Sequence, residues 1–207
     1  MTSILSVTFE VPDPAAADDF YATAFGVGDR VRTRESQAPT TGFRGYLMSL
    51  VVSQPSTVDS LFGTALHGGA TALKPPTKSF WGYGGVLRDP YGTLWKIASS
   101  SKKDTGPATR DIDDIVLLLG GDDVAAAKSV YVEHGLSVTK SFGRKYVEFD
   151  TAPVRLALYS RRAAAKDAGV PMEGTGSHRL VIGTDAEPMT DPDGFTWEAT
   201  ATSRPVG

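Results

Sequence analysis

The chain has 207 residues, of which 41% are hydrophobic and 22% charged. This ordinary globular composition argues against a long disordered tail or a low-complexity chain. With 21 basic and 24 acidic residues the formal net charge is -3, which argues against nucleic-acid binding, because such binding needs a surplus of lysine and arginine. Cysteine is absent, so disulfides, thiolate metal sites and cysteine nucleophiles are excluded.

The lengths of the apolar runs and the first residues of the sequence bear on where in the cell the protein is found. The longest runs, such as 115–119, cannot cross a bilayer. The first residues, MTSILSVTFEV, show no charged leader and no cleavage pattern, so we expect a first strand rather than a signal peptide. We therefore predict a cytoplasmic protein that binds neither a membrane nor nucleic acid.

The first half of the chain alternates strands with helices. Apolar residues at every second position predict a strand over 5–11, and helical spacing follows over 15–25. Gly26 and Gly28 fit the end of that helix. We expect further strands over 29–34, 46–52, 70–73, 81–87 and 93–98, and a second helix over 57–67.

A polar stretch separates this half from a second one of similar pattern. Residues 99–107, SSSKKDTGP, are small and turn-prone, and they are the best candidate for a linker. After it we expect strands over 112–119, 137–141, 146–150, 154–159, 179–182 and 196–201, and helices over 124–134 and 161–168.

Two pairs of segments indicate an internal repeat. DPYGTLWKIA at 89–98 and DPDGFTWEAT at 191–200 match in Asp, Pro, Gly and Trp at the same offsets. ILSVTFEV at 4–11 and IDDIVLLL at 112–119 are strands that each lead into a helix. The repeat predicts a duplicated α+β unit, with an N-terminal domain at 1–99, a linker at 100–110 and a shortened C-terminal domain at 111–207.

In combination, these segments resemble the glyoxalase/bleomycin-resistance family, also called the vicinal oxygen chelate (VOC) superfamily. The resemblance is carried by VTFEVPDPAAADDFYATAFGVGDRV, by VDSLFGTALHGGATALKPPTKSFWGYGGVLRDPYGTLWKIA and by DPDGFTWEA. It implies an α+β fold of tandem glyoxalase-like βαβββ modules, whose curved mixed sheets carry helices on the outer face. It further implies a small-molecule cavity inside the sheet, often with one divalent metal, and a homodimer as one option.

The chain departs from the usual family arrangement. The first module is shortened after Arg34 and the last between Thr184 and Thr190. Two fairly complete modules remain, over 45–99 and 111–160.

The metal-ligand positions that the resemblance implies differ between the two halves. In the N-terminal half they fall on Ser6, roughly Leu47, and Lys96. A hydroxyl, an aliphatic side chain and an ammonium group do not make a chelating set, so we expect no metal in that half.

In the C-terminal half the same positions fall on Asp114, His178 and Glu198. One imidazole and two carboxylates suit a Mn, Fe, Ni or Zn ion with positions left open for substrate. Such a site predicts a metal-dependent lyase, isomerase or dioxygenase, in which Glu198 is the catalytic residue that moves a proton when it is not a ligand.

The alternative interpretation of these residues involves no metal. His178 then caps a turn, and Asp114 lies at a solvated strand start. Lys96 and Glu198 occupy equivalent repeat positions, so an ion pair between them takes the place of the metal.

A set of aromatic and basic residues predicts a site for an organic ligand: Trp81, Tyr83, Lys96, Arg144 and Tyr146. Aromatic walls bind organic rings, and a cation holds a carboxylate or phosphate. The structural alternative is that the aromatic rings pack in the core and Arg144 lies in an exposed turn. We therefore expect a small-molecule-binding protein of the glyoxalase/bleomycin-resistance type with a reduced or absent metal site, and the metal-dependent enzyme is the alternative.

Overall fold

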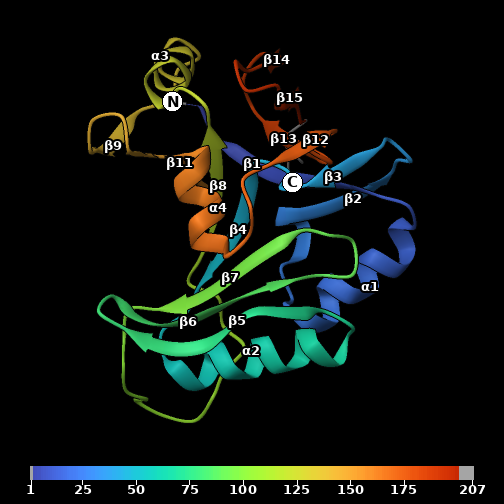
Figure 1. Ribbon diagram of the computed structural model, residues 1–207, viewed down its shortest axis with the longest axis vertical. Coiled ribbons are helices and arrows are strands. Elements are labelled where there is room, and N and C mark those ends of the chain that lie inside the picture. Colours follow the sequence, from blue (N-terminus) through green and yellow to red (C-terminus); the bar gives the residue numbers. More distant parts are fainter. Residues whose placement is uncertain (1, 201–207) are drawn as a thin grey trace, which may run out of the picture.

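The computed structural model describes residues 2–200, which form an α+β fold as predicted (Figure 1). None of the helices in this range combines the length and apolar character that crossing a membrane requires. The helices are α1 (Pro14–Ala24), α2 (Pro55–His67), α3 (Val124–Glu133) and α4 (Arg161–Ala168), with a short 3-10 turn at Gly28–Arg30.

The largest sheet has eight strands and joins the two most complete modules. It is mixed, because β4 pairs in parallel with β7 and antiparallel with β8. Its strands, in spatial order, are β5 (Thr71–Ser79), β6 (Gly82–Arg88), β7 (Leu94–Ser99), β4 (Tyr46–Val51), β8 (Asp114–Gly121), β11 (Val154–Ser160), β10 (Tyr146–Phe149) and β9 (Val138–Ser141).

A smaller sheet of five strands joins the first module to the last. Its strands, in spatial order, are β14 (Met189–Thr190), β15 (Thr196–Ala199), β13 (Leu180–Thr184), β1 (Ile4–Val11) and β2 (Val31–Glu35). The short strands β12 (Gly174–Gly176) and β3 (Thr40–Gly42) form a separate pair. Each of the three sheets therefore takes strands from both halves of the chain. The predicted domains at 1–99 and 111–207, with a linker at 100–110, are not tested by this arrangement and stay a prediction.

The side chains of the eight-stranded sheet alternate between two cores. On β4, Tyr46, Met48 and Leu50 belong to the large core, which also contains the buried faces of α1, α2 and α3 and the inner face of the five-stranded sheet. Leu47 points the other way, into a smaller core with the alanines of α4. In Figure 1, α2 lies on the lower side of β5–β7 and α4 on the upper side. The helix predicted over 161–168 is therefore confirmed as α4, and it packs on the face of the sheet opposite α2.

Most predicted elements lie within a few residues of the observed ones, and the differences involve edges and short strands. β5 continues through Pro75 and Pro76 to Ser79, whereas we expected it to end at residue 73. The prolines are accommodated because β5 is an edge strand whose register shifts between Lys74 and Thr77. The short strands β3, β12 and β14 were not expected. The last residue of the strand predicted at 196–201 lies outside the described residues.

The repeated Asp-Pro motif forms a buried hydrogen-bond network. The carboxylate of Asp89 is buried and accepts four hydrogen bonds. The Tyr21 hydroxyl on α1 donates at 2.8 Å and the Trp95 indole N–H on β7 at 2.9 Å. The backbone N–H groups of Tyr91 and Thr93 donate at 2.9 and 2.8 Å. One carboxylate therefore closes the turn before β7 and ties α1 to that strand.

Asp191 makes the matching network in the second half. It is buried and accepts from the Tyr131 hydroxyl on α3, and more weakly from the Trp197 indole on β15 at 3.5 Å. The backbone N–H groups of Asp193 and Phe195 donate at 3.0 and 2.9 Å. The matched Asp and Trp of the two segments thus have a structural role, and this agreement supports the predicted duplication.

We expect Asp89→Asn to lower the free energy of unfolding by about 1–3 kcal/mol, because the amide NH2 group faces other donors whichever way it is turned. Asp191→Asn is expected to do the same. Asp19→Asn, at an exposed position on α1, is the matched control and changes stability by less than about 0.5 kcal/mol. Urea unfolding followed by tryptophan fluorescence measures the difference. Equal stability of Asp89→Asn and Asp19→Asn would show that the network is not structural.

Candidate functional site

The face of the eight-stranded sheet that α4 partly covers is hollow. A large lobe of about 880 Å³ lies over β8, β10 and β11. A small lobe of about 430 Å³ lies over β5, β6 and β7. The two lobes share Val51 and Lys96 in their walls. We call the two lobes together the cup.

An ion pair lies where the two lobes meet. The Lys96 Nζ atom on β7 is 2.7 Å from the Asp167 Oδ2 atom on α4, and the two side chains are 31% and 32% exposed. The Lys74 ammonium on β5 donates to the carbonyl oxygens of Lys166 and Asp167 at 2.7 and 2.6 Å. Lysine is favourable there because the C-terminal end of a helix carries partial negative charge. The last turn of α4 is thus held over the middle of the cup.

Two phenol rings line the large lobe. The rings of Tyr146 and Tyr159 have centroids 4.7 Å apart, and the Tyr146 hydroxyl donates to Glu148 at 2.5 Å. Burial raises the pKa of Tyr146, and the hydrogen bond and charge of Glu148 raise that pKa further. Burial and the charges of Asp167 and Glu148 also raise the pKa of Tyr159. At neutral pH both phenols therefore keep their protons and present a ring beside a hydroxyl donor.

A row of four residues crosses the middle of the cup. Lys96, Ser49, Val116 and Arg155 lie side by side on β7, β4, β8 and β11. Two cations, one hydroxyl and one aliphatic side chain do not fit a divalent metal. The cup therefore has polar groups for a ligand, and its central row has no chelating set.

The structure does not bring together the three metal ligands predicted in the C-terminal half. Asp114 lies on β8, where its Oδ1 atom is 2.9 Å from the Arg155 Nε atom. Glu198 lies on β15 in the other sheet, 2.9 Å from Arg34, which also contacts Glu10 at 2.7 Å. Lys96 and Glu198 therefore have other partners, and the predicted ion pair between them is wrong.

His178 lies before β13, with both ring nitrogens occupied. Its Nδ1 atom is 2.6 Å from the carbonyl oxygen of Arg44, and its Nε2 atom is 3.0 Å from that of Asp193. The ring stacks on Phe195 at a centroid distance of 4.0 Å. Within residues 2–200 no cluster of three or more His, Cys, Asp or Glu side chains is placed to hold a metal ion. Asp114, His178 and Glu198 thus lie apart, so we derive no chemical step from a metal at these residues.

The predicted ligand-binding residues have different surroundings. Lys96 and Tyr146 line the large lobe. Trp81 borders the small lobe at the β5–β6 turn and is 84% exposed. Tyr83 also lines the small lobe. Its hydroxyl donates to Asp59 of α2 at 2.8 Å, and its partly buried ring packs against the large core.

Arg144 lies in the exposed turn between β9 and β10. This agrees with the alternative interpretation, in which Arg144 is not a ligand-binding residue. It is not among the residues that line the cup.

Several residues of the cup were not predicted from the sequence. Arg155 and Tyr159 alternate with the buried Val154, Leu156 and Leu158, so the period-two pattern of that strand could have placed both on the cup face. Asp167 could not be placed in this way. It lies on α4, and the local sequence does not show that this helix packs across the open face of the sheet.

No protein-family model and no curated protein matches the chain. Solved structures do match it. Glyoxalase I from Zea mays superposes with a TM-score of 0.59 over 95% of this chain and 91% of its own, at 14% identity. A putative dioxygenase from Bacillus subtilis subsp. subtilis str. 168 superposes with a TM-score of 0.54 over 87% of this chain and 69% of its own, at 13% identity. The chain has the glyoxalase fold. The superposition therefore confirms the predicted glyoxalase fold. At 13–14% identity it shows the fold alone.

The tyrosines allow a direct check of the cup and its surroundings. Burial raises the pKa of each of the seven tyrosines, which are Tyr21, Tyr46, Tyr83, Tyr91, Tyr131, Tyr146 and Tyr159. Burial together with Asp59 raises the pKa of Tyr83 to about 12.

We therefore expect no full phenolate absorbance step near pH 10 in the folded protein at 295 nm, with Tyr83 losing its proton near pH 12. Because the unfolded phenols lose their protons near pH 10, the stability that the tyrosines contribute is fully present below pH 10 and is lost as the pH rises through their raised folded pKa values. A full step of several tyrosines at pH 10, with the fold intact by circular dichroism, would contradict the burial described here.

Proposed function

We propose that this protein binds a small organic molecule in the cup, without using a metal for binding. The main support is the cavity of about 880 Å³ that the two most complete modules wall together. Pockets of this size, with apolar walls and a few convergent polar groups, are the usual sites for small ligands. The ligand class that suits these walls is an aromatic molecule with at least one polar group.

Each part of the large lobe has a role in this proposal. The neighbouring rings of Tyr146 and Tyr159 offer a stacking surface. Lys96 and Arg155 supply positive charge, and each already has a carboxylate partner in Asp167 or Asp114. A ligand carboxylate would therefore compete with a protein carboxylate, and a ligand hydroxyl or amine would bond to those same carboxylates.

Cytoplasmic location and a homodimer stay predictions from the sequence. The metal-dependent enzyme also stays a prediction, and nothing in the positions of Asp114, His178 and Glu198 favours it.

A ligand screen tests the proposal. We expect at least one compound in a panel of aromatic acids, phenols and amines to raise the melting temperature, since a ligand that binds only the folded state stabilises it. Tyr159→Leu and Lys96→Gln should each weaken the affinity of that compound by about tenfold or more, because they remove a ring contact and a charged partner. Isothermal titration calorimetry measures the affinities.

Leu66→Ala is the control, because Leu66 is an exposed apolar residue on α2 that lines neither lobe of the cup. It should leave the affinity unchanged. If no compound stabilises the protein, or if Leu66→Ala and Tyr159→Leu weaken binding equally, the cup is not the binding site.

A further inference from the structure

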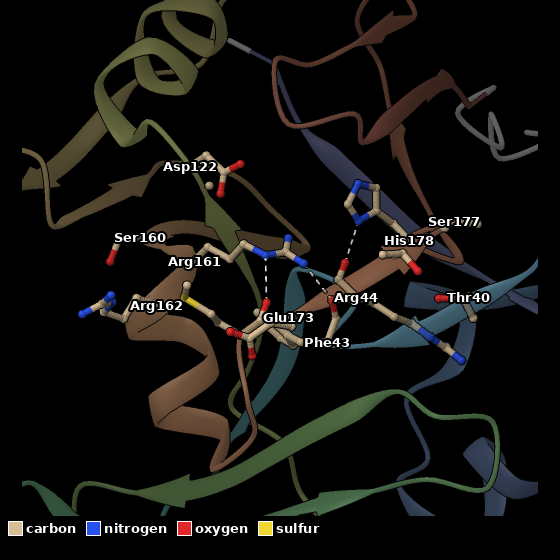
Figure 2. A pocket seen from close by; sticks show the side chains of 15 residues that line it. Thr40, Phe43, Arg44, Asp122, Ser160, Arg161, Arg162, Glu173, Ser177 and His178 are labelled. Carbon is tan, nitrogen blue, oxygen red and sulfur yellow. Dashed lines mark hydrogen bonds between the residues drawn. The ribbon is translucent and has the colours of Figure 1, made fainter.

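A second cavity, of about 620 Å³, lies at the N-terminal end of α4 (Figure 2). Its walls are the segments 40–44, 121–122, 160–162 and 172–178, interrupted at a few positions. None of its residues lines either lobe of the cup. We call it the arginine cavity, and the proposed function makes no use of it.

Arginine is the dominant charged residue of this cavity. Arg44, Arg161 and Arg162 line it, against the two carboxylates of Asp122 and Glu173. Among residues 2–200 none of the three arginines forms an ion pair, although the protein as a whole is acidic. Three guanidinium groups without a carboxylate partner create a positive potential, and such a potential attracts an anion.

Arg161 is held in position by the backbone. Its Nε atom donates to the carbonyl oxygen of Met172 at 3.1 Å, and its Nη2 atom donates to that of Phe43 at 2.9 Å. The guanidinium also lies over the Phe43 ring at 5.4 Å. Figure 2 shows the group in the middle of the cavity, between Glu173 and His178. Because two edges are anchored, the remaining N–H groups are oriented before any ligand arrives, which lowers the entropy cost of binding.

An imidazole and a hydroxyl add to the same cavity. Both nitrogens of His178 face carbonyl oxygens, of Arg44 and Asp193. Carbonyl oxygens only accept, so each contact is a hydrogen bond when the facing ring nitrogen carries a proton. The Thr40 hydroxyl oxygen is buried and has no hydrogen-bond partner in the described part of the chain. A buried hydroxyl without a partner is unfavourable unless something bonds to it.

We propose that the arginine cavity binds the oxyanion group, phosphate or carboxylate, of a small polar molecule. Arg161 holds the oxyanion, since a planar guanidinium matches the oxygens of both groups. Arg162, the next residue of α4, adds positive charge from the rim of the cavity. The Arg44 guanidinium points away from Arg161 (Figure 2) and donates to the carbonyl oxygen of Tyr91 at 2.8 Å, so its charge acts at longer range. Asp122 and Glu173 accept hydrogen bonds from hydroxyl or amine groups elsewhere in the same molecule.

Titration with two simple anions tests this proposal. Inorganic phosphate and acetate are added separately to the full-length protein at constant ionic strength, and amide chemical shifts are followed by NMR. We expect saturable shifts at Gly121, Gly174 and Gly176, which line the cavity. The tighter of the two anions indicates whether the natural ligand is a phosphate or a carboxylate.

Variants separate a specific site from general attraction. Arg162→Gln should weaken anion binding by about tenfold, the usual effect of removing one charge-assisted contact, and the fold should tolerate it because Arg162 is exposed. Arg161→Lys should weaken binding at least as much. Arg32→Gln, at an exposed arginine outside the cavity, and Lys96→Gln in the cup should have no effect.

Two results would overturn the proposal. One is the absence of saturable shifts at the three glycines with either anion. The other is an equal loss of binding in Arg162→Gln and Arg32→Gln, which would mean that the anion responds only to overall charge. Neither result bears on ligand binding in the cup.

Discussion

The pairing of β4 with β8 is the contact on which the rest of the site depends. It runs antiparallel from Tyr46 opposite Leu119 to Val51 opposite Asp114, and it joins modules from the two halves of the chain in one sheet. Without this pairing, Lys96 and Ser49 would not lie beside Val116 and Arg155. The cup would then be lined by strands of one module only. Because side chains alternate along a strand, this register also decides which residues face α4 and which enter the large core.

The five-stranded sheet shows what happens when the same modules are shortened. Arg34 lies between Glu10 and Glu198 there, in an arrangement of charges that is partly open to solvent. Such exposed ion pairs contribute little to stability. The two sheets thus use matched positions for different purposes, and Lys96 and Glu198, which the repeat aligns, have separate partners in separate sheets.

Local pattern predicted the elements, and it did not predict how distant elements meet. Alternation predicted most strands, and Gly26 and Gly28 followed the first helix as expected. β5 was cut short because two prolines argue against a strand unless it lies at an edge with a bulge, which is a property of the whole sheet. The three predicted metal ligands lie apart for a similar reason. Each residue type was suitable, but Asp114 and Glu198 belong to different sheets, and only the pairing of modules decides this.

The most direct test of this account locates the bound molecule. Methyl-labelled protein is titrated with a compound that stabilises it, and the methyl shifts of valine and alanine are recorded by NMR. Binding in the cup predicts the largest shifts at Val51, Ala98 and Val116, which line it. Shifts confined to Val181 and Ala199 of the five-stranded sheet, with the cup methyls unmoved, would contradict it.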